Sequence, residues 1–180
     1  TQYKLGNIIT EDAQNEIQKI MNDLSVGGEV DKLNETERIR KVAQLGKQNK
    51  LKSVKVDFFL LSKTNEVFMF DLKTVKPNKT DFVSYKRNML EWLAVYFFQN
   101  PQAKVNTIIS IPYNPYEPKP YARWTMKGML DLKREVMVAE EFWNFLGASN
   151  AYLDLLDCFE KAGIELRSEI DAYFKRFNKK

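Results

Sequence analysis

The sequence predicts a mixed α/β fold, in which helices flank a sheet, within a single domain of 180 residues. Several long segments carry apolar residues at helical spacing. Three short runs are rich in β-branched and aromatic residues, and turn-forming residues bound them. The composition, 44% hydrophobic and 29% charged, is typical of a chain that buries a full core. The predicted order of elements is α-α-β-β-α-β-α-α-α.

Two helices are expected first. Thr10 is a candidate N-cap, and the apolar residues after it recur at helical spacing until Gly27. A second helix is expected to begin at Asn34 and to run through ETERIRKVAQLG, with Ile39 and Val42 on its apolar side. Both helices precede the strands.

The next two elements form a predicted β-hairpin. Residues 54–61 and 66–73 are short apolar runs, and the polar segment SKTN separates them. After a proline-containing break, a long helix is expected from Thr80 or Asp81 to about Asn100. A helix between two strands is typical of an α/β chain.

The last third of the chain is predicted to be largely helical. The run VNTIISI, residues 105–111, predicts a buried strand, and a Pro/Tyr-rich loop follows it. We expect a core over about residues 34–112 and a helical part over about residues 113–180. Three helices are expected in that part: about 126–146, 150–162 and a last segment that ends near Phe177.

The absence of histidine from the sequence excludes more classes of catalytic and metal site than any other feature of the composition. With no histidine in the sequence, Ser-His and Cys-His nucleophiles, His-ligated zinc and nucleases with a histidine base are excluded. A single cysteine, Cys158, excludes an intramolecular disulfide and a Cys-rich zinc site. Any hydrolytic chemistry must therefore rest on carboxylates, lysines and a hard metal ion.

The charge and hydropathy patterns indicate the kind of partner and location. A net charge of +4 and a pI near 9 favour an anionic partner, although part of the excess lies in the terminal run KRFNKK. The longest uncharged apolar run, Trp92 to Phe98, is too short to cross a bilayer, and no secretory signal is visible. We expect a cytoplasmic protein without a membrane segment.

Charged residues interrupt the apolar strands of the predicted hairpin. Asp57 lies within VKVDFFLL, and Asp71 and Lys73 lie within EVFMFDLKT. Asp71 and Lys73 point to the same side because side chains alternate along a strand. A hairpin with SKTN as its loop brings Asp57 within about one residue of Asp71. Two carboxylates this close repel unless a cation lies between them, so the pattern predicts a Mg²⁺-binding catalytic centre.

The same residues have a simpler interpretation. An aspartate two residues before a lysine is common on solvent-facing strands, and the three charges would then form a salt-bridge cluster in a basic domain without catalytic activity. Three features favour the catalytic centre: the aspartate of the preceding strand, the apolar character of both strands, and the basic segment TVKPNKT that follows.

With Asp57 as the first acid and Asp71-Leu72-Lys73 as the D-x-K motif, the arrangement resembles the PD-(D/E)xK nuclease superfamily, except that Val56 stands where many members have proline. The segments DLKTVKPNKTDF, YKRNMLEW, IPYNPYEPKPYARWTMKGMLDLK and VAEEFWNFLG are similar to those of TdeIII-like type II restriction endonucleases. The resemblance implies a restriction-endonuclease-like catalytic core and Mg²⁺-dependent hydrolysis of double-stranded DNA to 5′-phosphate and 3′-hydroxyl ends. It also implies a prokaryotic homodimer that cuts a G/C-rich palindrome of the GGNCC type.

The resemblance assigns roles to the motif residues. Asp57, Asp71 and the main-chain carbonyl of Leu72 would hold the Mg²⁺ ion. Lys73 would orient or help to deprotonate the attacking water. In-line attack by water needs no protein nucleophile, which agrees with the lack of histidine.

A further acid from an N-terminal helix completes the site in many superfamily members. Glu35 and Glu37 are the two candidates. Glu37 lies three residues after Asn34, which suits a capping role. Glu35 lies one turn before Ile39, on the inward side, so we expect Glu35 to be the catalytic acid.

Polar and basic residues around the predicted centre are candidates for contact with double-stranded DNA. Arg123, between Tyr121 and Trp124, is the candidate for a bidentate bond to guanine. A solvated surface is the alternative for the charged residues, and loop packing is the alternative for the aromatic ones. The candidates are Thr74, Lys76, Asn78, Lys79, Lys86, Arg87, Lys119, Arg123 and Lys127.

A second alternative keeps the fold and changes the function. A nuclease of the same superfamily that serves in repair or junction resolution would read the shape of DNA rather than its sequence. Such an enzyme would cut a long DNA into a smear, whereas a sequence-specific enzyme would give discrete fragments.

Overall fold

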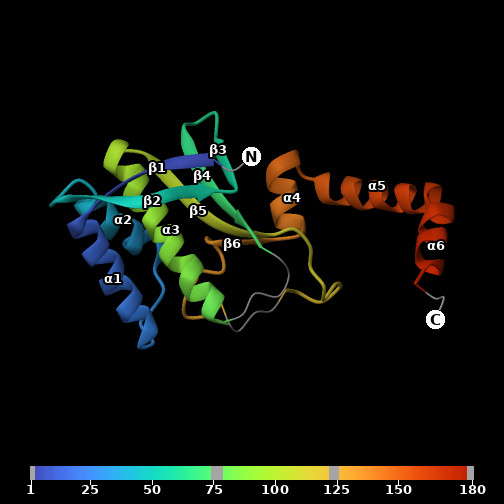
Figure 1. Cartoon of the computed structure of the whole chain (residues 1–180), viewed down its shortest axis with the longest axis horizontal. Helices are drawn as coiled ribbons and strands as arrows, with labels where there is room; N and C mark the ends of the chain where they lie inside the picture. Colours follow the sequence, from blue (N-terminus) through green and yellow to red (C-terminus); the bar gives the residue numbers. More distant parts are fainter. Residues whose placement is uncertain (1–2, 74–78, 122–125, 178–180) are drawn as a thin grey trace. The chain divides into compact units, whose positions relative to one another are not determined.

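The computed structural model describes residues 3–73, 79–121 and 126–177, and the side chains of residues 53, 79 and 80 lie outside that description. The chain forms two compact units, Thr1–Val138 and Ala139–Lys180, each described by itself below. Helices and strands alternate along the first unit, and the second unit is helical (Figure 1). The predicted mixed α/β class is therefore confirmed. The expected single domain stays a prediction.

The first unit contains two sheets and three helices. A two-stranded sheet has the order β1-β2, and a four-stranded sheet has the order β3-β4-β5-β6. The strands are β1 (Tyr3–Thr10), β2 (Gln48–Val56), β3 (Phe58–Leu61), β4 (Glu66–Leu72), β5 (Lys104–Ile111) and β6 (Val136–Val138). The helices are α1 (Glu11–Ser25), α2 (Lys32–Val42) and α3 (Lys79–Gln99).

The predicted hairpin forms with the predicted loop, but its first strand, expected over residues 54–61, is interrupted at Asp57: residues 54–56 belong to β2 in one sheet and residues 58–61 form β3 in the other. β3 and β4 pair antiparallel, and the four residues SKTN join them. The main-chain N–H of Ser62 donates to the carbonyl of Glu66 at 2.9 Å, and Asn65 adopts a φ of 59°, which asparagine tolerates in a tight turn. β4 then pairs parallel with β5, because α3 returns the chain to the same end of the sheet.

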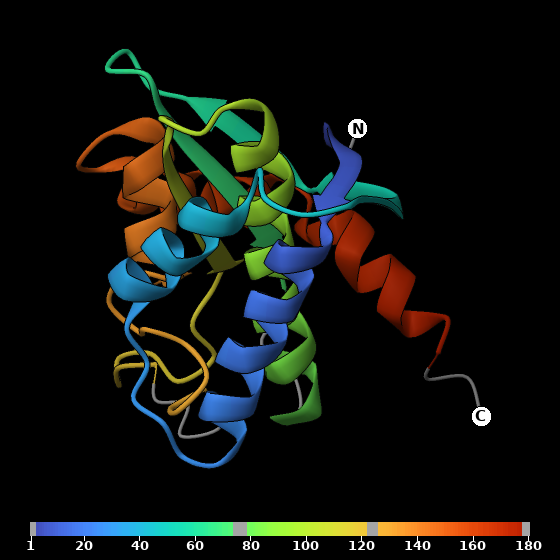
Figure 2. The same cartoon turned by 90° about the vertical axis from the view of Figure 1, so that its left-hand side faces the viewer.

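Helix α3 lies between the two sheets. It contacts β1 on one side and β5 on the other, and it runs beside α1 (Figure 2). Its buried residues cover most of its circumference, as expected of a helix with apolar neighbours on several sides. They include Phe82, Met89, Leu90, Leu93 and Phe97, each at most 1% exposed.

Strand β1 was not predicted from the sequence. It packs so closely on α3 that a Cβ added at Gly6 would lie 3.4 Å from Gln99 and 3.5 Å from Val95. Gly6 has a φ of +131°, and the pairing with β2 is irregular on both sides of it. The apolar alternation that marks a strand is broken at this point, so the sequence pattern alone does not reveal β1.

The limits of two predicted helices differ from the structure. α2 begins two residues earlier than expected, because the Asp31 carboxylate caps it by accepting from the N–H of Asn34 at 3.0 Å, and it ends at Val42, before Gly46. The helix expected over about residues 126–146 begins only at Glu140, and turns and β6 occupy the residues before it. Gly128 adopts a φ of +89°, and Asp131 accepts the N–H groups of Lys133 and Arg134, so local bonds replace helical ones.

The second unit consists of three helices, α4 (Glu140–Gly147), α5 (Ala151–Glu165) and α6 (Arg167–Lys175). Asn144 joins the first two, because its side-chain carbonyl accepts from the N–H of Tyr152 at 3.0 Å. Across both units, no helix in the described part of the chain has the length and hydropathy needed to span a membrane.

Candidate active site

The hairpin places Asp57 opposite Asp71. Asp57 is the single residue between β2 and β3, where the chain passes from one sheet to the other. Phe58 pairs with Phe70, and the main-chain N–H of Asp57 donates to the carbonyl of Phe70 at 3.1 Å. The predicted register, which brings the two aspartates together, is therefore confirmed.

A hydrogen bond fixes the Asp57 carboxylate at the end of β4. Its Oδ2 accepts from the main-chain N–H of Leu72 at 2.9 Å. The carboxylate thus lies against the backbone of the residue that separates Asp71 from Lys73. The role expected for the Leu72 carbonyl stays a prediction.

Lys73 bridges Asp71 and an aromatic ring. Its Nζ lies 2.7 Å from Oδ1 of Asp71 and 4.3 Å from the ring centroid of Tyr85 on α3. The N–H of Lys73 also donates to the carbonyl of Ser110 at 2.9 Å, so the backbone is held by β5 beyond the end of β4. The ammonium is therefore positioned by a carboxylate, a ring and a fixed backbone.

The three charged residues open into one hollow of about 570 Å³. One wall comes from β2 and the opposite wall comes from α3. The charged and amide side chains of its lining are Lys52, Lys55, Asp57, Asp71, Lys73, Asn88 and Glu91. An anionic ligand that enters this hollow meets lysines as well as the two carboxylates.

The electrostatics of Asp71 reflect its burial. Its side chain is only 11% exposed. Burial raises the pKa of Asp71 from 3.8 to about 6; the ammonium of Lys73 opposes that rise and the Asp57 carboxylate adds to it. Ionising both Asp57 and Asp71 therefore costs free energy. The ammonium of Lys73 offsets only part of that cost.

Sequence reasoning missed three charged residues that line this hollow, and the aromatic ring that contacts Lys73. Glu91 on α3 is partly buried, and burial raises the pKa of its carboxyl group. Tyr85, which holds Lys73, lies on the same helix. Lys52 and Lys55 lie on the part of β2 that was not recognised as a separate sheet. The quoted motif YKRNMLEW contains Tyr85 and Glu91, but only the helix orientation shows that they face the site.

Four buried charges form a second cluster. Lys86 Nζ lies 2.9 Å from the carboxylate of Glu135 and also contacts Glu35. Lys32 Nζ lies 3.4 Å from Glu135 and donates to the hydroxyl of Thr107. All five residues are at most 4% exposed, and the cluster joins α2 and α3 to the four-stranded sheet. Burial lowers the pKa of Lys32, and the Glu135 carboxylate counteracts that effect.

This cluster corrects two expectations. Glu35 does not face the hollow, because its carboxylate is paired with Lys86 in the core. The DNA contact expected from Lys86 is wrong for the same reason, since that side chain has no solvent exposure. Glu37, the other candidate acid, is exposed and forms an ion pair with Arg40 at 3.0 Å. Of the described acids outside the D-x-K hairpin, Glu91 is the one that lines the hollow.

The remaining predicted DNA contacts are exposed, engaged or not described. Lys119 and Lys127 are exposed. Arg87 is half-buried and donates to the side-chain carbonyl of Gln18 at 2.8 Å. Thr74, Lys76, Asn78 and Arg123, together with the side chain of Lys79, lie outside the described residues.

The oxygen ligands of this site suit Mg²⁺. This ion is commonly bound through one or two carboxylates, while water and substrate phosphate fill its other positions. Asp57 and Asp71 provide two carboxylates at one point, and the ammonium of Lys73 contacts Asp71 there. Among the described residues no group of three or more acidic, histidine or cysteine side chains is placed to hold a metal ion.

Comparisons with known proteins indicate the family of the chain. The sequence matches the HinfI type II restriction endonuclease family over residues 1–163. It is similar to the type II restriction enzyme MjaII of Methanocaldococcus jannaschii, with 30% identity over 163 residues, which are 83% of this chain and 44% of that protein. It is also similar to the type II restriction enzyme HgiCII of Herpetosiphon aurantiacus, with 26% identity over 119 residues, 65% of this chain and 43% of that protein.

No solved structure matches the chain. The chain spans less than half the length of the curated relatives that it matches. The family match nevertheless covers nearly the whole sequence, including the strands and helices that build the hollow. The chain therefore belongs to the HinfI family of type II restriction endonucleases.

Proposed function

We propose that the chain is a sequence-specific endonuclease that hydrolyses phosphodiester bonds of double-stranded DNA with the help of Mg²⁺. The observation that carries this proposal is the convergence of Asp57, Asp71 and Lys73 on one hollow. Family membership supports the reaction class. The chemistry of the three side chains supports hydrolysis by water, because in-line attack on a phosphate needs positioning and charge stabilisation and no protein nucleophile.

The side chains of the site have separate roles in the proposed reaction. Asp57 and Asp71, with the carbonyl of Leu72, would hold the metal ion, which would supply acidification of water and neutralise charge on the scissile phosphate. With the Asp71 carboxylate neutralised, the ammonium of Lys73 would be available to the phosphate or the attacking water. Tyr85 would keep the ammonium within the hollow.

We further propose cleavage at a G/C-rich palindrome of the GGNCC type, with 5′-phosphate and 3′-hydroxyl ends. Lys119, Lys127 and Arg123 are the proposed contacts from the Pro/Tyr-rich loop and its flank, and Arg87 and the segment 74–79 are the proposed contacts near the cut. A prokaryotic cytoplasmic location agrees with this substrate.

A homodimer fits a palindromic site, because two matching half-sites need two related active centres. α5 and α6 support it: their exposed apolar residues include Leu153, Phe159, Ile164, Tyr173 and Phe174, which are 54–69% exposed. Both helices expose an apolar face of the kind that marks protein interfaces. We place the dimer contact on these two helices.

The decisive experiment is digestion of unmethylated phage DNA by the full chain, with Mg²⁺ or with a chelator. Discrete fragments that appear only with Mg²⁺ are expected, and sequencing their ends gives the recognition site and the positions of the phosphates. A smear would indicate the repair or junction nuclease. Intact DNA, bound but uncut, would indicate the non-catalytic binding domain.

A further inference from the structure

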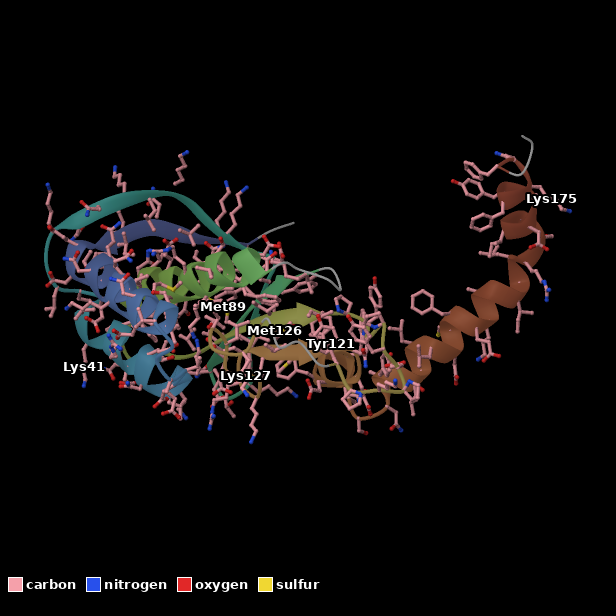
Figure 3. All side chains as sticks on the ribbon, turned by 90° about the horizontal axis from the view of Figure 1, so that it is seen from below. Lys41, Met89, Tyr121, Met126, Lys127 and Lys175 are labelled. Atoms are coloured by element: carbon pink, nitrogen blue, oxygen red, sulfur yellow. The ribbon has the colours of Figure 1, made fainter. Side chains whose placement is uncertain are left out.

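The β1–β2 ribbon has two different faces. Its inner face is apolar: Leu5, Ile9, Val54 and Val56 are buried, and β1 packs against α3. Its outer face is basic, and nitrogen-tipped side chains project outward along β2 in Figure 3. The exposed basic residues of the paired strands are Lys4, Lys50, Lys52 and Lys55.

An irregularity in the strand pairing keeps these lysines on one side. Lys50 and Lys52 are exposed, and regular alternation would then turn residue 54 outward and residue 55 inward. The register shifts between the pairs Gly6–Val54 and Ile8–Lys50, where β2 advances by more residues than β1. As a result Val54 is buried and Lys55 is exposed, so both halves of β2 present lysine to solvent.

The outer lysines lie beyond salt-bridge distance of any carboxylate in the described part of the chain. None of the four forms an ion pair there, whereas Lys19, Lys73 and Lys104 each do. Lys4 lies directly opposite Lys55 in the ladder. Like charges in this position destabilise a sheet, so an anionic partner that binds over the ribbon would relieve their repulsion.

The basic face leads into the candidate active site. Lys52 and Lys55 line the same hollow as Asp71 and Lys73. Asp57 follows Lys55 by two residues, at the point where β2 ends. The two carboxylates repel a polyanion, and the lysines beside them supply the compensating attraction.

We propose that Lys4, Lys50, Lys52 and Lys55 form a strip that binds the phosphate backbone of double-stranded DNA beside the cut. This inference rests on the proposed function, because it takes its ligand from the reaction in the adjoining hollow. Lys50 and Lys52 lie about 7 Å apart along β2, far enough to contact different phosphates. A flat row of lysines contacts phosphates and reads no bases, so the strip adds affinity and orientation rather than specificity.

The test compares two double variants that remove the same charge. Lys52→Gln/Lys55→Gln changes the strip, and Lys63→Gln/Lys104→Gln changes the opposite end of the four-stranded sheet, where Lys104 pairs with Glu66 in the register. Binding of a short fluorescent duplex is titrated at several salt concentrations in chelating buffer, so that no cleavage occurs. The strip variant should bind about ten- to a hundredfold more weakly in moderate salt, with a salt slope smaller by about two.

The outcomes separate the strip from the nuclease. A salt slope unchanged in the strip variant, an equal loss in both variants, or no binding by the unsubstituted chain would overturn the strip. Recovery of the slope in Lys52→Arg/Lys55→Arg would support it, because arginine keeps the charge. Cleavage of phage DNA by the unsubstituted chain is measured in parallel. If the unsubstituted chain binds DNA through the strip but does not cut it, the proposed nuclease function would be contradicted and the strip would stand.

Discussion

Lys73 is the counter-ion of Asp71, with Nζ 2.7 Å from Oδ1, and the same ammonium lies 4.3 Å from the ring centroid of Tyr85. Under the proposed function this contact would compete with a bound metal ion, because a divalent cation would also neutralise the Asp71 carboxylate. Lys73 would then be available to the substrate within the same hollow. The relationship leads to separate expectations for the lysine, the ring and the carboxylate.

Asp71→Ala and Lys73→Ala should each abolish DNA cleavage while the chain keeps its fold and its DNA affinity. Removal of a metal ligand or of the group that orients water costs about a hundredfold or more in rate. The measurement is single-turnover cleavage of phage DNA, with duplex binding in chelating buffer and circular dichroism alongside. Lys104→Ala, at the far end of the sheet, is the matched control. Cleavage at the ordinary rate in either active-site variant would rule out this assignment.

Tyr85→Leu should slow cleavage without weakening DNA binding, because the leucine side chain no longer attracts the ammonium of Lys73. A cation–π contact of this kind is worth about 1 kcal/mol, so a rate loss of about three- to tenfold is expected. Tyr85→Phe keeps the ring and should cut at nearly the ordinary rate. Equal losses in the two variants would show that the hydroxyl, not the ring, is what matters.

Much of this site follows from the sequence, because the alternation of a strand and the length of a hairpin loop fix where Asp57, Asp71 and Lys73 point. The partners of these residues do not follow. Glu35 has the periodicity of an inward-facing acid, but only the packing of α2 on α3 reveals that Lys86 meets it. Helical periodicity in the sequence indicates that a side chain is buried, but it does not indicate which element packs over that side chain.

The same limit explains the outer parts of the fold. Gly6 interrupts the apolar alternation of β1 at the point where the strand packs closely on α3. The turns after Gly128 replace an expected helix. Both depend on contacts between segments far apart in sequence. The lysines of β2 were therefore missed as a group, since the register shift that aligns Lys52 and Lys55 is a property of the pair of strands.

The folded chain without metal should lose stability as the pH rises through the range in which Asp71 ionises. The folded pKa of about 6 lies above the ordinary 3.8, so the folded state binds more protons than the unfolded state between these values. The contribution of Asp71 is fully present below the lower value and is lost by up to about 3 kcal/mol above the higher value. Urea unfolding in chelating buffer across this pH range measures it.

Asp71→Asn provides the control for that titration, since asparagine resembles the protonated acid. The variant should match the unsubstituted chain at acidic pH and should be the more stable of the two at neutral pH. A less stable variant at neutral pH would mean that the ion pair with Lys73 outweighs burial. That outcome would favour a structural salt-bridge cluster over a metal site.

The proposed dimer predicts that the full chain sediments as a two-fold assembly and that Phe159→Ser/Phe174→Ser yields a monomer. Both rings are exposed on α5 and α6, at 68% and 60%, and their burial would supply much of the apolar contact. Leu61→Ser, also at an exposed apolar position but in the β3–β4 hairpin, is the control and should leave the assembly unchanged. A monomeric unsubstituted chain at every protein concentration tested would refute the dimer.

Lys86→Met should destabilise the fold by about 3–5 kcal/mol, because it leaves the buried carboxylates of Glu35 and Glu135 with Lys32 as their remaining cationic partner. Urea unfolding measures the loss, and Lys86→Met/Glu35→Met should recover part of it by removing one unpaired carboxylate. The folded fraction of Lys86→Met should show the salt dependence of DNA binding found for the unsubstituted chain, in contrast to the variant at Lys52 and Lys55. A selective loss of DNA affinity without a loss of stability would place Lys86 at the DNA surface instead of in the core.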